Sequence, residues 1–467
     1  MNKLIKEIVF YGIIGVLAKA MGIFLVPVYT RVLLPSEMGV VSVFTTILGG
    51  LAILSDLQII HGMGRYYYEY DNLDKRRRMI GTGYIASLAV SFSWSFLLII
   101  GSGYWGKMFF KSTDYTNVFN IIAISLPLSI SQSYLNYVFR LGHIIRNYTI
   151  TSLFTAFTTL LSIIYLVVHR KLGVIGIFLG QLIGFAVGNI CIYGLGGIKL
   201  YKFTIEWNIL KKILVFCLPT IPAVLGGWGQ IVFGQIIIIS YTDFAKLGIY
   251  EVALKISSVL LLFQMAFLLA WNPHLLAGIK NRKDSSYYTK GFYLYLAVGV
   301  LFTIPFVLFS KEVISVVAGT DFHGASKYIG ITSIAVFLQG VPSLVNVGII
   351  KEKKMVFNSI AFIVGSIINI IITMSMIKQY GIITVPFGLL VGRLAQCCII
   401  YIISQRIHFI QYSAKTILYY FVLYSLLTFL HVFVFNLQLK YRMAICLIFI
   451  TSVFWVSYRS LVNSNGN

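Results

Sequence analysis

IVFYGIIGVLAKAMGIFLVPVY, residues 8–29, is the stretch that decides what kind of protein this is. It is long and apolar enough to cross a bilayer, which takes roughly 20 residues. Lys19 lies about ten residues into it, near the midplane, where a lysine costs about 2.5–3.5 kcal/mol on insertion scales. Gly12, Gly15 and Gly22 share its helical stripe, and small residues let helices approach closely. We therefore expect Lys19 to face the protein or a polar cavity; the alternative is that it snorkels or pairs with a carboxylate.

The rest of the chain has the same apolar character. Of its 467 residues, 58% are hydrophobic and 11% are charged, and the mean hydropathy is +0.88. Apolar runs long enough to span recur from end to end, which predicts an all-α polytopic membrane protein with about fourteen transmembrane helices. Their expected ranges are 8–30, 39–60, 80–104, 118–140, 148–168, 173–195, 213–239, 247–272, 291–318, 327–350, 356–377, 381–403, 414–436 and 442–460. The first run is too long for the core of a cleavable signal peptide, so none is expected.

The formal net charge of +23 is explained by topology. Cytoplasmic segments of membrane proteins collect Lys and Arg, and the basic residues concentrate inside when the N-terminus is placed there. Both termini are then cytoplasmic, and nucleic acid is not an expected partner. The run Lys75–Arg78 is interpreted as a topological anchor, with a contact to anionic lipid as the alternative. The five cysteines lie in apolar segments without metal-ligand spacing, so no metal, cofactor or disulfide framework is expected.

Two distant matches indicate an internal repeat. Glu37–Val43 resembles Lys246–Val252 at an offset of 209, and Leu172–Ile175 matches Tyr380–Ile383 at an offset of 208, a register that also pairs Gly184 with Gly392. Helices one to six then correspond to helices seven to twelve in parallel orientation, and membrane proteins built this way commonly bind substrate between their halves. We expect two pseudo-symmetric six-helix lobes around a central cavity, residues 1–212 and 213–404, followed by two additional helices in residues 405–467.

Candidate binding residues are the charges at membrane depth. Glu251 and Lys255 lie four apart with the acid first, the favourable order for a pair along one helix face. Lys19, Lys255 and Arg393 are candidates for holding an anionic diphosphate, which suits lysine as a point charge. Asp56 and Glu251 are candidates for binding a coupling cation. The alternative is a purely structural Glu251–Lys255 pair, because buried charges usually pair.

Three further residues complete the candidate site. Gln230 lies beside a Pro/Gly stripe on the seventh expected helix, and we place it in the cavity. Arg31 and Arg140 lie at helix ends, where they could flank the cavity mouth or simply snorkel. No catalytic constellation and no Gly-rich phosphate loop are found, so an enzyme is not expected. A membrane glycosyltransferase or polymerase would usually have a large polar external loop, and no loop here is long enough.

Several segments resemble one family. Phe10–Gly12 and the run FLVPVYTRVLLPSEMG, residues 24–39, resemble the opening of the bacterial polysaccharide-biosynthesis, or O-antigen, flippases. Leu218-Pro219, Lys246–Lys255 and Phe139–Gly142 resemble further positions of that family, which belongs to the multidrug/oligosaccharidyl-lipid/polysaccharide (MOP) exporter superfamily.

The resemblance implies a cavity lined by helices one, two, seven and eight. It also implies a flippase that moves an undecaprenyl-diphosphate-linked oligosaccharide from the inner to the outer leaflet of the cytoplasmic membrane by alternating access. The products would be O-antigen of lipopolysaccharide, capsule or another exopolysaccharide, with membrane lipid and a polysaccharide polymerase as partners. The alternative is a cation-coupled multidrug exporter of the same fold, whose cavity should be acidic or aromatic; the lysines favour an anionic substrate.

Overall fold

The computed structural model describes residues 20–70, 72–280, 284–352, 354–433 and 438–463, and this part of the chain contains helices and no strands. Twelve helical segments are long and apolar enough to cross a membrane, and one of them, Val356–Ile407, contains two long helices. The chain is therefore an all-α, multi-pass membrane protein. Most of the expected first helix, 8–30, falls outside the described residues, so the number fourteen stays a prediction.

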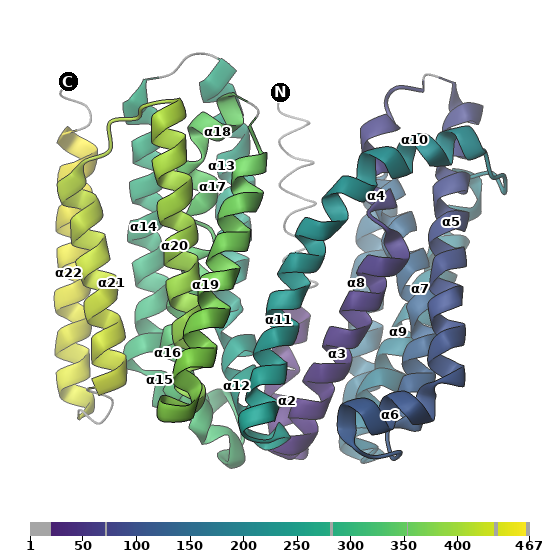
Figure 1. Cartoon of the computed structure of the whole chain (residues 1–467), viewed down its shortest axis with the longest axis horizontal. Coiled ribbons are helices and arrows are strands. Elements are labelled where there is room, and N and C mark those ends of the chain that lie inside the picture. Colours follow the sequence, from purple (N-terminus) through teal and green to yellow (C-terminus); the bar gives the residue numbers. More distant parts are fainter. Residues whose placement is uncertain (1–19, 71, 281–283, 353, 434–437, 464–467) are drawn as a thin grey trace. The chain divides into compact units, whose positions relative to one another are not determined.

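Contacts divide the chain into two compact units, Met1–Gln235 and Ile236–Asn467. This division falls within α11, downstream of the boundary expected at residue 212, and Figure 1 shows the helices of each unit. The helices that begin in the first unit are α2 Val26–Val32, α3 Pro35–Asp56, α4 Ile59–Tyr66, α5 Leu73–Ile100, α6 Ser102–Phe110, α7 Thr116–Leu141, α8 Ile145–Ile164, α9 Gly173–Gly194, α10 Trp207–Cys217 and α11 Ile221–Tyr241. Those of the second are α12 Phe244–Ser257, α13 Val259–Lys280, α14 Ser285–Leu308, α15 Ser310–Val317, α16 Ser326–Leu338, α17 Pro342–Val345, α18 Val347–Lys351, α19 Val356–Tyr380, α20 Thr384–Ile407, α21 Ala414–Phe433 and α22 Leu439–Asn463.

Local sequence explains where the two repeated helices begin. Pro35 occupies the first turn of α3, where its missing N–H costs nothing, and the Glu37 carboxylate accepts the Leu34 N–H at 2.9 Å. In the second unit the Asp243 carboxylate accepts the Lys246 N–H at 2.7 Å and caps α12. At the start of both α3 and α12, an acidic side chain thus accepts a backbone N–H and stabilises the first turn.

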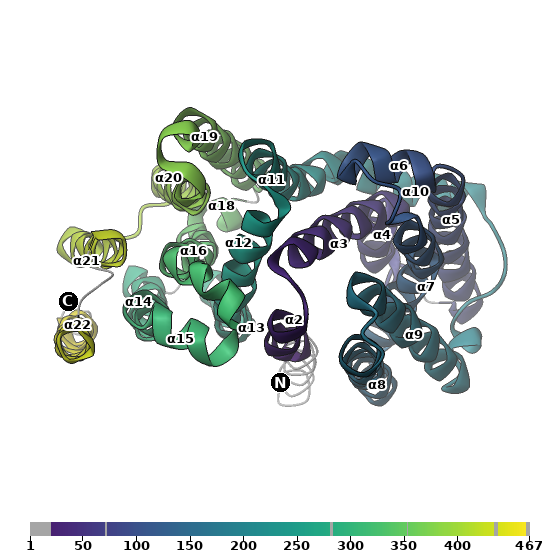
Figure 2. The same cartoon turned by 90° about the horizontal axis from the view of Figure 1, so that it is seen from below.

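Equivalent glycines of the sequence repeat lie at close helix–helix contacts in both units. Each unit pairs two long helices, α8 with α9 and α19 with α20 (Figure 2). A Cβ added to Gly184 of α9 would overlap Thr159 of α8, and one added to Gly392 of α20 would crowd Gly365 of α19. Gly184 and Gly392 are 208 residues apart, so the repeated glycines permit close helix packing in each unit.

Prolines interrupt two of the expected spans. The span expected at 213–239 is divided: α10 ends at Cys217, a 3₁₀ turn follows at Leu218–Thr220, and α11 begins at Ile221. The span expected at 327–350 is divided as well, since α16 ends at Leu338 and α17 begins at Pro342. Pro219 and Pro342 account for these breaks, because proline lacks an N–H and its ring clashes with the preceding turn.

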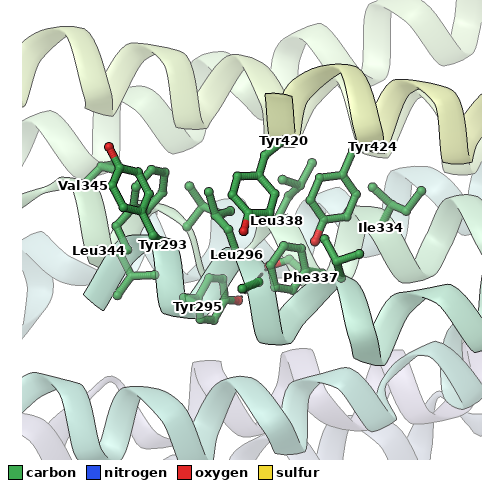
Figure 3. Packing of buried hydrophobic residues seen from close by; sticks show 14 of the residues in the cluster. Tyr293, Tyr295, Leu296, Ile334, Phe337, Leu338, Leu344, Val345, Tyr420 and Tyr424 are labelled. Carbon is green, nitrogen blue, oxygen red and sulfur yellow. Dashed lines mark hydrogen bonds between the residues drawn. The ribbon is translucent and has the colours of Figure 1, made fainter. Parts of the chain in front are cut away.

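An aromatic stack joins α21 to the core of the second unit. The rings of Tyr295 and Phe337 stack at 4.8 Å between centroids, and Phe337 stacks on Tyr424 of α21 at 5.4 Å. Figure 3 shows Tyr420 and Tyr424 pointing from α21 toward α14 and α16. The Tyr295 hydroxyl also donates to the Phe337 carbonyl at 2.9 Å, so the large aromatic side chains are fixed in place.

An ion pair anchors α22 to the end of α14. The Arg442 guanidinium donates to both carboxylate oxygens of Glu312 on α15, at 2.6 and 2.8 Å, and to the Leu308 carbonyl at 2.9 Å. The Arg442 side chain is 11% exposed and that of Glu312 is 42% exposed. Bidentate pairing with partial burial makes this contact stronger than an ordinary surface ion pair.

Candidate functional site

Asp56 lies at a break in the second membrane helix. It is the last residue of α3, and the next two residues, Leu57 and Gln58, adopt left-handed conformations with φ of 48° and 58°. Each costs about 1–2 kcal/mol for a non-glycine residue. The Asp56 side chain is buried, its carboxylate lies 3.4 Å from the Ile60 N–H, and it forms no ion pair with any other described residue. A buried carboxylate at a discontinuous helix is the kind of arrangement that transporters use for ions.

The environment of Asp56 comes from three other helices of the first unit. Tyr134 of α7 is fully buried close to it, and the Cys217 thiol at the end of α10 donates to the Gln58 carbonyl at 3.0 Å. Gly62 of α4 leaves the space in which the Cys217 sulfur lies. The break in the second membrane helix is therefore packed directly against the α10–α11 connection.

Gln230 is half-buried on α11, but the side-chain hydrogen bonds from this helix to other described helices come from two other residues. The Trp228 indole donates to the Thr46 carbonyl at 2.8 Å. The Gln235 amide donates to the hydroxyls of Ser42 and Thr46, both at 2.8 Å. Sequence reasoning missed these residues, although seven positions separate Trp228 from Gln235 and place both on one helix face.

Glu251 and Lys255 lie four apart on α12, as the sequence predicted, and both are half-buried. Their charges are close enough to interact. Tyr250, beside Glu251, is buried, and the Ser258 hydroxyl donates to the Lys255 carbonyl at 2.5 Å. This arrangement is compatible with a structural pair and with a pair that opens to bind a ligand.

Arg393 lies apart from this pair, on α20. Its guanidinium donates to the Gln396 side chain at 3.0 Å and lies 5.5 Å from the centroid of the Phe362 ring on α19. The described contacts of Arg393 are therefore with α19 and with its own helix, α20. No described contact links Arg393 to Lys255 or Glu251. Cation–π contacts of this kind favour a desolvated arginine.

The helix-end arginines and Lys19 complete the predicted set. Arg31 is exposed in the last turn of α2. Arg140 is exposed in the last turn of α7, where it lies over the rings of Tyr137 and Tyr148 at 5.0 and 6.0 Å. Lys19 lies outside the described residues. Among the described residues, no group of three or more His, Cys, Asp or Glu side chains is placed to hold a metal ion.

The second unit contains an apolar groove that the sequence did not reveal. It has a volume of about 690 Å³ and is lined by α14, α16, α20, α21 and the end of α19. None of its lining residues is charged; they include Leu296, Ile334, Leu338, Leu390 and Tyr424. Several of these side chains appear in Figure 3. The volume lies in the range of ligand sites, and the lining suits a hydrocarbon chain.

Comparisons with known proteins give the fold. No family model matches the chain, and no curated protein matches it. The lipid II flippase MurJ, in an inward closed conformation, superposes with a TM-score of 0.74 at 13% identity, over 98% of this chain and 99% of that one. An inward-facing multidrug resistance MATE family transporter has a TM-score of 0.68 at 12% identity, over 83% of this chain and 94% of that one.

A third structure is a MOP superfamily transporter from Pyrococcus furiosus, described by a reverse polarity of its binding pocket that suggests a different function. Its TM-score is 0.65 at 12% identity, over 88% of this chain and 97% of that one. These identities are low, so the similarity is one of fold. All three neighbours are transporters or flippases. The chain therefore has the fold of MurJ and of these MOP-superfamily transporters, and the match to MurJ covers nearly its whole length.

Proposed function

We propose that this protein is a flippase for an undecaprenyl-diphosphate-linked oligosaccharide, which it moves from the inner to the outer leaflet of the cytoplasmic membrane by alternating access. The sugar would be a repeat unit of O-antigen, capsule or another exopolysaccharide. A sugar chain cannot cross hydrocarbon unaided, because its hydroxyl groups would lose their water partners. The substrate therefore needs a polar route for its head and an apolar one for its tail.

The apolar groove is the observation that carries this proposal. A polyprenyl tail gains no hydrophobic energy on leaving lipid, which is equally apolar, so a binding site must attract it by close packing. The uncharged groove of about 690 Å³ offers such a surface along α20 and α21. An exporter of small, water-soluble cations has no need of a groove for a long hydrocarbon chain.

The membrane-embedded cations support an anionic substrate. Lys255 and Arg393 are both half-buried in membrane helices. We propose Lys255 and Lys19 as the groups that bind the diphosphate, with Arg393 as a third candidate and Arg31 and Arg140 at the cavity mouth. Glu251 would neutralise Lys255 when no substrate is bound.

Domain roles and partners follow from the same proposal. Residues 1–212 and 213–404 would form the two moving lobes, and residues 405–467 would supply the additional helices. Asp56 and Glu251 would bind the coupling cation, with Gln230 as a polar cavity residue. Both termini would be cytoplasmic, and a polysaccharide polymerase would receive the flipped product.

The test is deletion in the native host, followed by extraction of polyprenyl-linked glycans. A diphosphate-linked oligosaccharide should accumulate on the cytoplasmic face while surface polysaccharide is lost. Complementation then tests the site. Lys255→Ala should fail to restore export, whereas Lys378→Ala, at an exposed lysine of α19, should restore it. Full export by a Lys255→Ala protein that inserts normally would exclude Lys255 from the site.

The groove has its own matched pair of variants. Ser425 lines the groove from an exposed position on α21, and its neighbour Leu426 is exposed without lining it. Ser425→Trp should narrow the groove and reduce export, while Leu426→Trp should leave export unchanged. Equal effects of the two would exclude the groove from tail binding.

A multidrug exporter is the second candidate, because a MATE family transporter shares this fold over 83% of the chain. The same deletion separates the two functions. New sensitivity to cationic drugs without accumulation of a lipid-linked oligosaccharide would favour the exporter.

A further inference from the structure

One end of the first unit presents an interfacial segment, residues 197–217, formed by a 3₁₀ turn at Gly197–Leu200, a short extended stretch and α10. This helix packs across α4 and α5, at the end of the unit where α5 begins (Figure 1). It precedes the long membrane helix α11 and is not itself among the candidate spans. The segment is therefore a surface feature at the end of the membrane helices.

The interfacial segment is firmly attached to α5. The Lys202 N–H donates to the Arg77 carbonyl at 3.0 Å, and a Cβ on Gly81 would overlap the Lys202 carbonyl oxygen. The Glu206 N–H donates to the buried Thr82 hydroxyl at 3.1 Å. Tyr201 is buried, and its ring centroid lies 4.9 Å from that of Tyr84 on α5. The backbone that carries the exposed side chains of the segment is therefore attached to α5.

α10 separates buried from exposed residues. Its inner face is formed by Ile209, Leu210, Ile213 and Cys217, all of which are buried. Its outer face combines aromatic and apolar side chains, Trp207 at 75% exposure, Val215 and Phe216, with the exposed lysines Lys211 and Lys212. Phe203, just before the helix, is 72% exposed. Water would solvate such an outer face poorly, whereas a membrane interface accommodates apolar and cationic groups together.

The acidic side chains that the structure describes beside the segment, Asp74 and Glu206, are already engaged. Asp74 pairs with Arg78 at 2.8 Å and also with Lys202, and Glu206 lies 3.5 Å from Arg78. The other basic side chains here form no ion pair with any described residue; they are Lys75, Arg76, Arg77, Lys199, Lys211 and Lys212. Among the described residues, this surface therefore keeps several positive charges without an acidic partner next to exposed aromatic rings.

We propose that the interfacial segment binds the headgroups of anionic phospholipids in the adjacent leaflet. Trp207 and Phe203 would insert at the level of the acyl–headgroup boundary, where aromatic rings are favoured. Lys199, Lys211 and Lys212 would contact the phosphates above them. Each such lysine contributes about fivefold to the affinity for an anionic surface. The positive-inside rule alone would explain the basic residues of the interfacial segment. It would not explain the exposed aromatic side chains of Phe203 and Trp207 beside them.

The experiment uses the full chain, purified in mild detergent and titrated with phosphatidylglycerol or phosphatidylcholine, with bound lipid counted by native mass spectrometry. Wild-type protein should bind phosphatidylglycerol more tightly. The variant K199Q/K211Q/K212Q should lose that preference by about 100-fold. The control K107Q/K111Q/K378Q removes the same charge from exposed lysines elsewhere and should bind like wild type.

Two further comparisons distinguish a loss of lipid binding from misfolding of the variant. The variant K199R/K211R/K212R keeps the charge and should bind like wild type. Brominated phosphatidylglycerol should quench wild-type fluorescence more than that of W207F. No preference for phosphatidylglycerol in the wild type, or equal losses in the glutamine variant and the control, would overturn the proposal and favour an acidic protein as the partner of this surface.

Discussion

Removal of the Arg442 guanidinium should detach the start of α22 from the second unit. Arg442→Leu eliminates two hydrogen bonds to Glu312 and one to the Leu308 carbonyl. Breaking a fully buried pair costs about 3–5 kcal/mol, and an exposed one contributes about 0.2–1 kcal/mol. Arg442 is 11% exposed, but Glu312 at 42% can recover water, so we expect a loss of about 2 kcal/mol.

Thermal unfolding in detergent, at one fixed heating rate, measures this loss. For a unit of this size, about 2 kcal/mol corresponds to a drop in Tm of about 4–8 °C. The matched control is Arg65→Leu, which breaks an exposed pair with Glu69 and should shift Tm far less. Adding Glu312→Gln to Arg442→Leu should cause little further loss, because the two residues act together. Additive losses, or equal shifts in variant and control, would refute the reasoning.

The ion pair also predicts a pH dependence with a defined sign. Burial raises the pKa of the Glu312 carboxyl, but the hydrogen bonds and charge of Arg442, a backbone hydrogen bond and the charge of Lys311 together outweigh burial and hold this pKa below its ordinary value of 4.5. A carboxyl whose folded-state pKa is depressed stabilises the protein above its unfolded pKa, and this stability is lost as pH falls through the folded value. The difference in Tm between wild type and Glu312→Gln should therefore be full near pH 7 and shrink below about pH 4.5.

Three other predictions address packing, titration and coupling. Gly184→Leu should lower Tm, since added atoms meet α8 and overpacking costs about 1–3 kcal/mol, whereas Gly194→Leu, with no described atom within 4 Å of its Cβ, should not. Burial and the nearby Lys351 ammonium lower the pKa of His408, so Lys351→Gln should raise it, measured by the pH profile of diethylpyrocarbonate modification; an unchanged profile would contradict this. Asp56→Asn should abolish the dependence of transport on the coupling ion gradient, and wild-type dependence in reconstituted vesicles would exclude Asp56 as the coupling group.

Sequence alone was sufficient for the class of protein and for much of the helix pattern. Apolar runs of bilayer length must be spanning helices, because only closed hydrogen-bonding structures are stable in hydrocarbon. The start of α3 was expected at residue 39, whereas Pro35 and Glu37 start the helix four residues earlier by local chemistry. The offset of 208 between Gly184 and Gly392 indicated equivalent helices, and in both units these glycines lie where two helices pack closely. Each of these features depends on residues close together in the chain or on a long repeat.

Tertiary structure decided the features that depend on distant residues. Leu57 and Gln58 adopt left-handed backbone conformations, although neither is a glycine, so the sequence does not predict them. The packing of Cys217 against Gln58 joins residues 159 positions apart. The groove requires five helices of the second unit to meet, and the Arg442–Glu312 pair joins two helix ends 130 residues apart. Hydropathy measures how apolar each segment is, but not which side chains face each other. Contacts between segments distant in sequence therefore had to come from the folded chain.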